Sequence, residues 1–286
     1  MQTTVFEFDH GMRLVTDGFG DAGAARRVVL LHGGGQTRHA WRSTAEALAE
    51  RQLYAITVDL RGHGDSDWHG SGDYDVSDFV RDIEALLTRI GPSVLVGASL
   101  GGIVSLMLAA RRDDLCEGLV LVDITPSMQL AGVKRIVGFM GSHPNGFATL
   151  DEAADAVAAY LPHRTRPRNT DGLRKNLRLG EDGRFRWHWD PKLLEAWSPE
   201  RFGVERGVRT VSERLAAASA LTVPTMLVRG RMSDIVGEED AAEFLKAVPR
   251  ASYVDLAGAR HMVVGDRNDV FTQSVLDFLS SLPPAG

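Results

Sequence analysis

The clearest chemical signal in the sequence is the segment 94–102 (VLVGASLGG), in which Ser99 has glycines two positions before and two positions after it. An apolar stretch precedes this G-x-S-x-G pattern, and a second one, 103–110, follows it. A strand that turns into a helix within about two residues strains its serine, and the glycines remove side chains that would collide. The N–H of Leu100 begins the helix and points toward the serine, where the helix dipole stabilises an anion. The spacing therefore predicts a serine nucleophile beside one oxyanion donor.

Parallel strands are expected on either side of this turn. Apolar residues run without alternation through 28–31, 94–96, 119–122 and 226–228, which is typical of strands covered by helices on both faces. One helix is predicted between them, begun by Asp75 and ended by Gly91 and Pro92. Its apolar residues recur every three or four positions: Val76, Phe79, Val80, Ile83, Leu86, Leu87 and Ile90.

Both ends of the chain extend this sheet. The segments 4–8 and 12–16 flank the turn sequence 9–11, which favours an antiparallel hairpin at the N-terminal edge. Near the C-terminus a helix is expected to cover the sheet, with Asp266 and Asn268 available as its caps. Its apolar face would contain Phe271, Val275, Phe278, Leu279 and Leu282.

A long insertion is predicted in the second half. The alternation of strand and helix stops near Asp123 and resumes near 223, and the residues between are too many for a plain loop and contain no comparable strand. We expect a core formed by 1–124 and 223–286, with 125–222 as an inserted helical cap. The cap's aromatic residues either form its own small core or face a substrate pocket below it. The large side chains concerned are Phe139, Met140, Phe147, Tyr160, Trp187, Trp189 and Trp197.

With these segments in place, residues 26–282 resemble the α/β-hydrolase family, in the branch with small esterases, cofactor-free haloperoxidases, C–C bond hydrolases and epoxide hydrolases. The segment 59–66 (DLRGHGDS) is similar to the family's D-x-R-G-x-G-x-S loop, which serves as scaffold. The segment 32–35 (HGGG) follows the first parallel strand, where the family places its second oxyanion donor. The resemblance implies the N–H of Gly34 as that donor, with His32 as a structural histidine. It also implies an α/β-hydrolase fold: a mostly parallel sheet with helices on both faces.

The resemblance further implies a catalytic triad. A serine hydroxyl needs a histidine as its base, and the histidine needs an acid to fix its tautomer. In the family the acid and then the histidine follow the nucleophile on later loops. Of the nine histidines only His261 follows the final strand, which begins at Tyr253 (253–256, YVDL). Asp234, in the loop beyond the stretch 226–228, is the predicted acid. Asp123, which ends the stretch 119–122, remains the alternative, since some family members place the acid there.

Composition limits the other functions. The 32 basic and 38 acidic residues give a net charge of −6, which disfavours nucleic acid and anionic membranes. The N-terminal residues do not resemble a signal peptide, and with a single cysteine, Cys116, a cytoplasmic protein is expected. The segment 63–69 contains histidine and aspartate but lacks a second ligand cluster, so no metal is expected. No nucleotide-binding motif occurs either, so no cofactor is expected.

The sequence as a whole predicts a serine hydrolase that cleaves a small to medium carboxylic ester or lactone through an acyl-enzyme. The same triad could cleave a C–C bond or form a peracid, and these alternatives stay open. A carboxylate nucleophile, as in epoxide hydrolases, is excluded by Ser99. The alternative from another class is a non-hydrolytic receptor for a small molecule on the same fold. The expected partner is the small ester or lactone, and a homodimer is left open.

Overall fold

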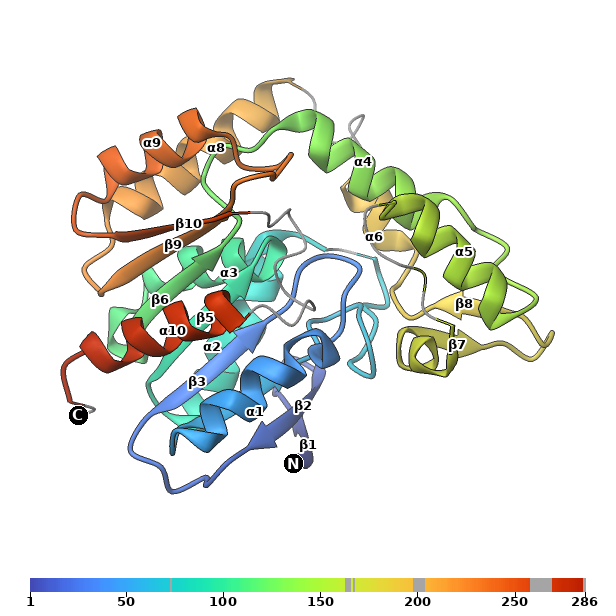
Figure 1. Ribbon diagram of the computed structural model, residues 1–286, viewed down its shortest axis with the longest axis horizontal. Helices are drawn as coiled ribbons and strands as arrows, with labels where there is room; N and C mark the ends of the chain where they lie inside the picture. The colour runs from blue at the N-terminus through green and yellow to red at the C-terminus, as the bar shows by residue number, and fades with distance from the viewer. Residues whose placement is uncertain (73, 163–165, 167, 198–203, 258–268, 285–286) are drawn as a thin grey trace.

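The computed structural model describes the chain except residues 73, 163–165, 167, 198–203, 258–268 and 285–286, and except the side chains of 204–209 and 269. Its centre is an eight-stranded sheet in the order β1-β2-β4-β3-β5-β6-β9-β10 (Figure 1). β1 and β2 are antiparallel to their neighbours, and the other strands are parallel, so the predicted mixed sheet is confirmed. The strands are β1 (Gln2–Glu7), β2 (Arg13–Phe19), β3 (Arg27–Leu31), β4 (Tyr54–Val58), β5 (Ser93–Ala98), β6 (Cys116–Val122), β9 (Thr225–Gly230) and β10 (Ser252–Leu256).

The central strands are apolar on both sides because both faces of the sheet are covered. In β3, Val28 and Leu30 pack in one hydrophobic cluster, whereas Val29 and Leu31 pack in the other. Every residue of β5 is buried. A strand in this position gains from burial on both faces, which is why these stretches do not alternate with polar residues.

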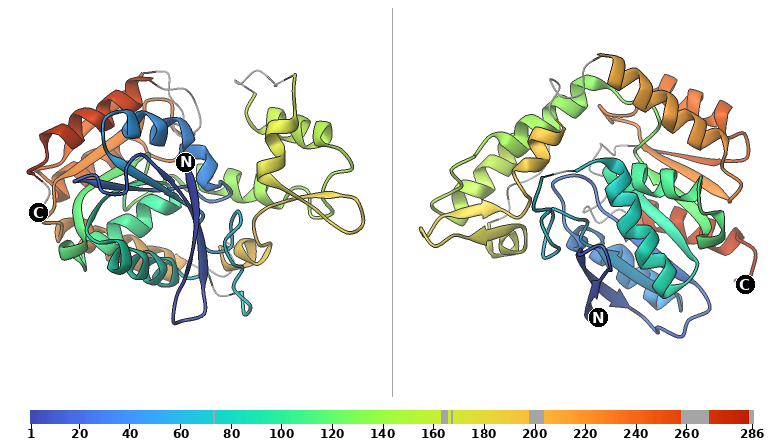
Figure 2. Two further views of the ribbon diagram at one scale, coloured as in Figure 1. Left: turned by 90° about the horizontal axis from the view of Figure 1, so that it is seen from below. Right: turned by 180° about the vertical axis from the view of Figure 1, so that it is seen from behind.

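Helices form a layer on each face of the sheet (Figures 1 and 2). α1 (Arg42–Glu50) and α10 (Asp269–Ser281) contribute to one cluster, and α2 (Val76–Ile90), α3 (Leu100–Ala109) and α9 (Glu238–Ala247) contribute to the other. α2 begins and ends as predicted: the Asp75 carboxylate accepts from the Ser77 N–H at 3.2 Å, and Gly91 ends the helix with φ +94°. Both predicted caps of the last helix, Asp266 and Asn268, lie outside the described residues. None of the described helices is long and apolar enough to cross a membrane.

The chain between β6 and β9 is mostly helical and lies largely to one side of the sheet, at the right of Figure 1. It contains α4 (Leu130–Gly141), α5 (Leu150–Tyr160), β7 (Leu177–Leu179), β8 (Phe185–Trp187), α6 (Lys192–Ala196) and α8 (Val204–Ser219). The strands β7 and β8, of three residues each, pair with one another, and the sequence analysis did not predict them. α8 contacts α3 and α9, so this part of the segment 125–222 lies in a helical layer of the core. Short 3₁₀ helices complete the described elements: η1 (Arg38–Trp41), η2 (Asp113–Leu115) and η3 (Asp171–Asn176).

Candidate active site

Ser99 lies in the turn between β5 and α3 in a strained backbone conformation, with φ +47° and ψ −113°. The turn requires its glycines. A Cβ added to Gly97 would overlap the carbonyl of Gly101, and a Cβ added to Gly101 would overlap the carbonyl of Leu31. The side chain of Ser99 is partly exposed at the carboxyl end of the sheet. The local geometry is therefore that of a nucleophile held at the start of a helix.

The glycine-rich loop after β3 lies against this serine. A Cβ added to Gly33 would be 3.3 Å from the Cβ of Ser99. The Gly33 N–H donates to Gln36 Oε1 at 2.9 Å, and the Gly35 N–H donates to His63 Nε2 at 3.1 Å. Among the described residues, the N–H of the intervening Gly34 has no hydrogen-bond acceptor.

The backbone N–H of Leu100 resembles that of Gly34, since it too has no acceptor in the described part of the chain. The next N–H of the helix, that of Gly101, donates to the carbonyl of His32 at 3.1 Å, which joins the start of α3 to the loop after β3. Two N–H donors near a serine can stabilise the anion of a tetrahedral intermediate.

His32 is a structural residue of this loop. Its Nδ1 donates to the carbonyl of Gly33 at 2.8 Å, and its Nε2 accepts from the N–H of Leu60 at 3.0 Å. Complete burial lowers the pKa of His32 to about 4. Both ring nitrogens are therefore used to hold backbone, and the ring is unsuited to act as a base.

A small cavity of about 70 Å³ opens beside Ser99. The segment between β6 and β9 supplies its apolar wall: Ile136, Phe139, Met140 and Tyr160. Phe139 stacks on Tyr160 with ring centroids 4.1 Å apart. The ring of Trp197 lies close to Gly34, since a Cβ added to Gly34 would be 3.1 Å from it. Phe139, Met140 and Tyr160 were among the residues expected either to face a pocket or to form a core, whereas Ile136 was not. Helical periodicity alone does not tell which neighbour a helix face meets, so the sequence could not decide between these positions.

The remaining aromatic residues of this segment pack with one another. Trp187 lies 5.0 Å from Trp189 and 5.2 Å from Phe147, measured between ring centroids. All three are buried. The aromatic residues of this segment are therefore divided between the wall of the cavity and these buried side chains, which belong to the same hydrophobic cluster as one face of the sheet.

Asp123 lies one residue beyond β6, at the same level as Ser99. The two strands are adjacent, and Val122 pairs with Ala98. Asp123 is completely buried and has φ +49°. Its carboxylate accepts from the Gly230 N–H at 3.0 Å and from Ser233 Oγ at 2.5 Å. Such a carboxylate is fixed in orientation on the strand next to that of Ser99.

Asp234, the predicted acid, lies in the loop beyond β9 and is 37% exposed. Its Oδ2 is 2.7 Å from the guanidinium of Arg135 on α4. His261, the predicted base, lies outside the described residues. Within the described residues the structure thus brings Ser99 close to the loop of Gly34, while the carboxylate of Asp234 is directed to Arg135.

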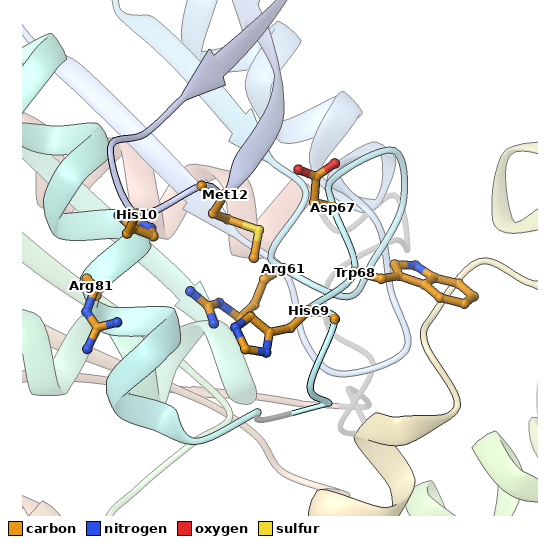
Figure 3. Close-up of a pocket in the computed structure, with 9 residues that line it drawn as sticks. His10, Met12, Arg61, Asp67, Trp68, His69 and Arg81 are labelled. Atoms are coloured by element: carbon orange, nitrogen blue, oxygen red, sulfur yellow. The ribbon is translucent and has the colours of Figure 1, made fainter.

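A second cavity, of about 220 Å³, is separate from the first and shares none of its lining residues (Figure 3). Its charged groups pair mainly with other protein groups. Arg61 forms two hydrogen bonds to Asp82, which also pairs with His10 at 2.8 Å. Asp67 in turn pairs with Arg13 at 3.1 Å. This internal pairing suits a structural role for the cavity wall.

Comparison with known proteins identifies the family to which the chain is similar. Residues 26–267 match the family described as alpha/beta hydrolase fold. An esterase of Mycobacterium tuberculosis is 32% identical over 231 residues, covering 77% of this chain and 71% of the relative. The 2-(acetamidomethylene)succinate hydrolase of Mesorhizobium japonicum is 27% identical over 266 residues, covering 91% and 90%.

Solved structures agree on the fold. A crystal structure of E-2-(acetamidomethylene)succinate hydrolase superposes with a TM-score of 0.81 at 22% identity, covering 98% of this chain and 100% of the other. The structure of a Mycobacterium tuberculosis esterase gives a TM-score of 0.75 at 27% identity, covering 98% and 91%. These relatives support a hydrolase, and the chain belongs to the alpha/beta hydrolase fold family.

Proposed function

We propose that this chain is a serine hydrolase that cleaves a carboxylic ester or lactone of small to medium size through an acyl-enzyme. The observation that carries the proposal is the position of Ser99: strained, partly exposed, at a helix start, and beside an apolar cavity. A strained serine at the mouth of a cavity serves no packing purpose that alanine or glycine would not serve better. Relatives named as an esterase, a lipase and a succinate-derivative hydrolase support the same class of reaction.

The proposed reaction uses the groups of the site in order. His261 takes the proton of Ser99 as Oγ attacks the substrate carbonyl carbon. The developing oxyanion accepts hydrogen bonds from the N–H groups of Gly34 and Leu100, each worth on the order of 10² to 10³ in rate. The C–O bond breaks, the alcohol leaves with the proton from His261, and the acyl group stays on Ser99. Water, deprotonated by His261, then releases the acid.

For the acid of the triad, we favour Asp123 over Asp234. Asp123 is completely buried, and the strand register puts it level with Ser99 on the neighbouring strand. In the sheet, β6 lies next to β5, whereas β9, which precedes the loop of Asp234, is one strand further away. Asp234 instead pairs with Arg135 and is one-third exposed or more. A carboxylate held by a guanidinium is poorly placed to orient an imidazole.

The cavity favours a short acyl group. The cavity of about 70 Å³ has room for about five water molecules or non-hydrogen atoms of similar size, since each needs roughly 10–15 Å³ of cavity volume. The wall formed by Phe139, Met140 and Tyr160 is apolar apart from the tyrosine hydroxyl. We therefore expect acetyl to butyryl esters to be preferred over octanoyl esters.

A fluorophosphonate probe and a panel of p-nitrophenyl esters test the proposal. Wild-type protein should be labelled by the probe and hydrolyse the short esters, and Ser99→Ala should lose both properties. Failure of the wild type to label or to hydrolyse any ester would favour the receptor function. Labelling without ester turnover would favour C–C cleavage or peracid formation, which β-diketone and peroxide substrates then distinguish.

The choice of acid has its own test. Asp123→Asn should lower kcat by up to about 10⁴, because the imidazole would lose its oriented acceptor. Asp234→Asn should leave kcat within a fewfold of wild type. The reverse pattern would restore Asp234 as the acid. Circular dichroism of both variants controls for folding.

A further inference from the structure

The N-terminal end of α4 is tightly joined to the loop that follows β9. The Gln129 N–H donates to the carbonyl of Ile235 at 2.8 Å, and its side-chain amide donates to Asp240 at 2.6 Å. A Cβ added to Gly132 would overlap the carbonyl of Asp234. The first turn of α4 is thus in backbone contact with the core, and the rest of the helix extends from this joint.

One ion pair continues the contact beyond the first turn. Arg135 Nη2 is 2.7 Å from Asp234 Oδ2, and the Arg135 guanidinium also lies over the ring of Tyr160, 5.4 Å from its centroid. The guanidinium therefore connects the core loop, α4 and the end of α5. A cation placed between a carboxylate and an aromatic face restricts both elements.

The same helix carries the cavity wall. Ile136, Phe139 and Met140 follow Arg135 within two turns and line the cavity beside Ser99, and Tyr160 lines it from α5. A rotation of α4 about its joint would displace these side chains together. Beyond its first turn α4 is also held by packing, since it contacts α6 and Met140 lies against Gly35. The ion pair adds a charged contact between α4 and the core loop that resists such a rotation.

We propose that the Asp234–Arg135 ion pair holds α4 over Ser99 and thereby sets the fit of the acyl group in the cavity. Both are positioning residues, because neither touches the reacting atoms. The inference rests on the proposed ester hydrolysis, since the cavity wall matters through the substrate that it contacts. It also gives Asp234 a role that differs from that of a triad acid.

The expected effect is modest and sensitive to salt. The two side chains are 37% and 46% exposed. An exposed ion pair of this kind changes the equilibrium constant for the state that it stabilises by a factor of about 1.4 to 5. Loss of the pair should therefore raise KM about threefold and leave kcat within twofold. Salt near 0.5 M screens exposed charges and should raise the wild-type KM by a similar factor.

Kinetics with p-nitrophenyl butyrate test the pair through Asp234→Asn, Arg135→Gln, the double variant and the charge exchange Asp234→Arg with Arg135→Asp. Each single variant should raise KM about threefold, the double variant should be no worse, and the exchange should recover most of the loss. The matched control is Asp182→Asn. Asp182 lies in the turn between β7 and β8 and forms an ion pair of similar length and exposure with Arg186 of β8. Neither residue lines the cavity beside Ser99. The control variant should leave KM unchanged.

Other outcomes would overturn the inference. A fall of kcat by several orders of magnitude in Asp234→Asn but not in Arg135→Gln would assign Asp234 to the triad. The positioning role of the ion pair would be refuted if KM were unchanged in both single variants. It would also be refuted if KM depended equally on salt in wild type and variants. Failure of the proposed function is recognised separately, because wild type would then not label with the fluorophosphonate. In that case native-state chymotrypsin cleavage after Phe139 or Tyr160, expected to be faster in Asp234→Asn than in Asp182→Asn, still tests the pair.

Discussion

Acidification from pH 7.5 to pH 5 is expected to destabilise this protein strongly, because three histidines in and beside the glycine-rich loop after β3 are buried as neutral rings. His32 and His63 lie 5.0 Å apart between ring centroids, and His63 and His188 lie 6.0 Å apart. His63 Nδ1 donates to the carbonyl of Arg61 at 2.9 Å, and His188 Nδ1 accepts from the Gly64 N–H at 2.8 Å. No ring has room for a second proton without loss of a backbone hydrogen bond or burial of a charge.

The surroundings of each histidine ring determine the direction in which its pKa shifts. Burial lowers the pKa of His32 to about 4 and that of His63 to about 3, and it lowers the pKa of His188 well below 6.5. Mutual repulsion among the rings adds to this effect. Nearby cations, Arg38 for His32 and Arg178 for His188, act in the same direction. The carboxylates of Asp59 and Asp190 oppose it at His63, and a backbone carbonyl opposes it at each ring.

The sign and size of the pH effect follow by linkage. A histidine with a lowered folded pKa favours the folded state fully above its unfolded pKa of 6.5, and this stability is lost as the pH falls toward the folded pKa. At pH 5, which is 1.5 units below 6.5 and above the folded pKa of His32 and of His63, each of these two neutral rings lowers the stability by about 2 kcal/mol, since one pKa unit is worth about 1.4 kcal/mol. The two rings together account for about 4 kcal/mol of the roughly 5–15 kcal/mol that stabilises a typical domain, and His188 acts in the same direction.

Urea unfolding followed by tryptophan fluorescence at the two pH values measures this loss. In His188→Asn the amide oxygen can accept from the Gly64 N–H, and the loss of stability on acidification should be smaller than in wild type, whatever the stability at pH 7.5. The control is His143→Asn, because His143 is exposed on the segment between β6 and β9. An equal pH dependence in wild type and His188→Asn would refute the reasoning, since it would mean that the buried ring is protonated without cost.

Three further substitutions test the packing of the site. Gly101→Ala should destabilise the fold by about 1–3 kcal/mol or more, because the new Cβ overlaps the backbone carbonyl of Leu31, and thermal unfolding measures the loss. Tyr74→Phe should cost about 1.5–3 kcal/mol in urea unfolding at neutral pH, because the tyrosine hydroxyl donates to the buried Asp190 carboxylate at 2.6 Å. Met140→Ala should enlarge the cavity and shift the preference in the ester panel by two or more methylenes toward longer chains, and an unchanged chain-length profile would place the acyl group elsewhere.

The central fold was predictable because its signals are local. Parallel strands buried on both faces are uniformly apolar, and the helix after Asp75 carries its own start signal and ends at Gly91. β7 and β8 escaped prediction because three residues are too few for a periodicity to develop. The packing of α8 on α3 and α9 depends on tertiary contacts, so the sequence did not separate it from the rest of 125–222.

The candidate nucleophile and the candidate acids differ in the same way. The strained turn at Ser99 was predictable because it requires glycines among the near neighbours of the serine in the sequence. Nothing comparable marks an acid: Asp123 and Asp234 each follow an apolar strand, and either fits the pattern. What distinguishes them is the order of strands in the sheet, which puts β6 next to β5 and leaves β9 one strand further away.

This strand order also bears on the two carboxylates together. A buried acid on the neighbouring strand can orient a base without help from the loop after β9. The carboxylate in that loop is then available for another contact, and here it meets Arg135 on the helix that forms the cavity wall. If Asp234 were the acid, the ion pair with Arg135 would compete with the imidazole for its oxygens, and every movement of α4 would disturb the triad. In the proposed arrangement the ion pair holds α4 and its cavity wall, while Asp123 orients the base independently of α4. Substitutions in the ion pair should therefore alter KM, and substitutions at Asp123 should alter kcat.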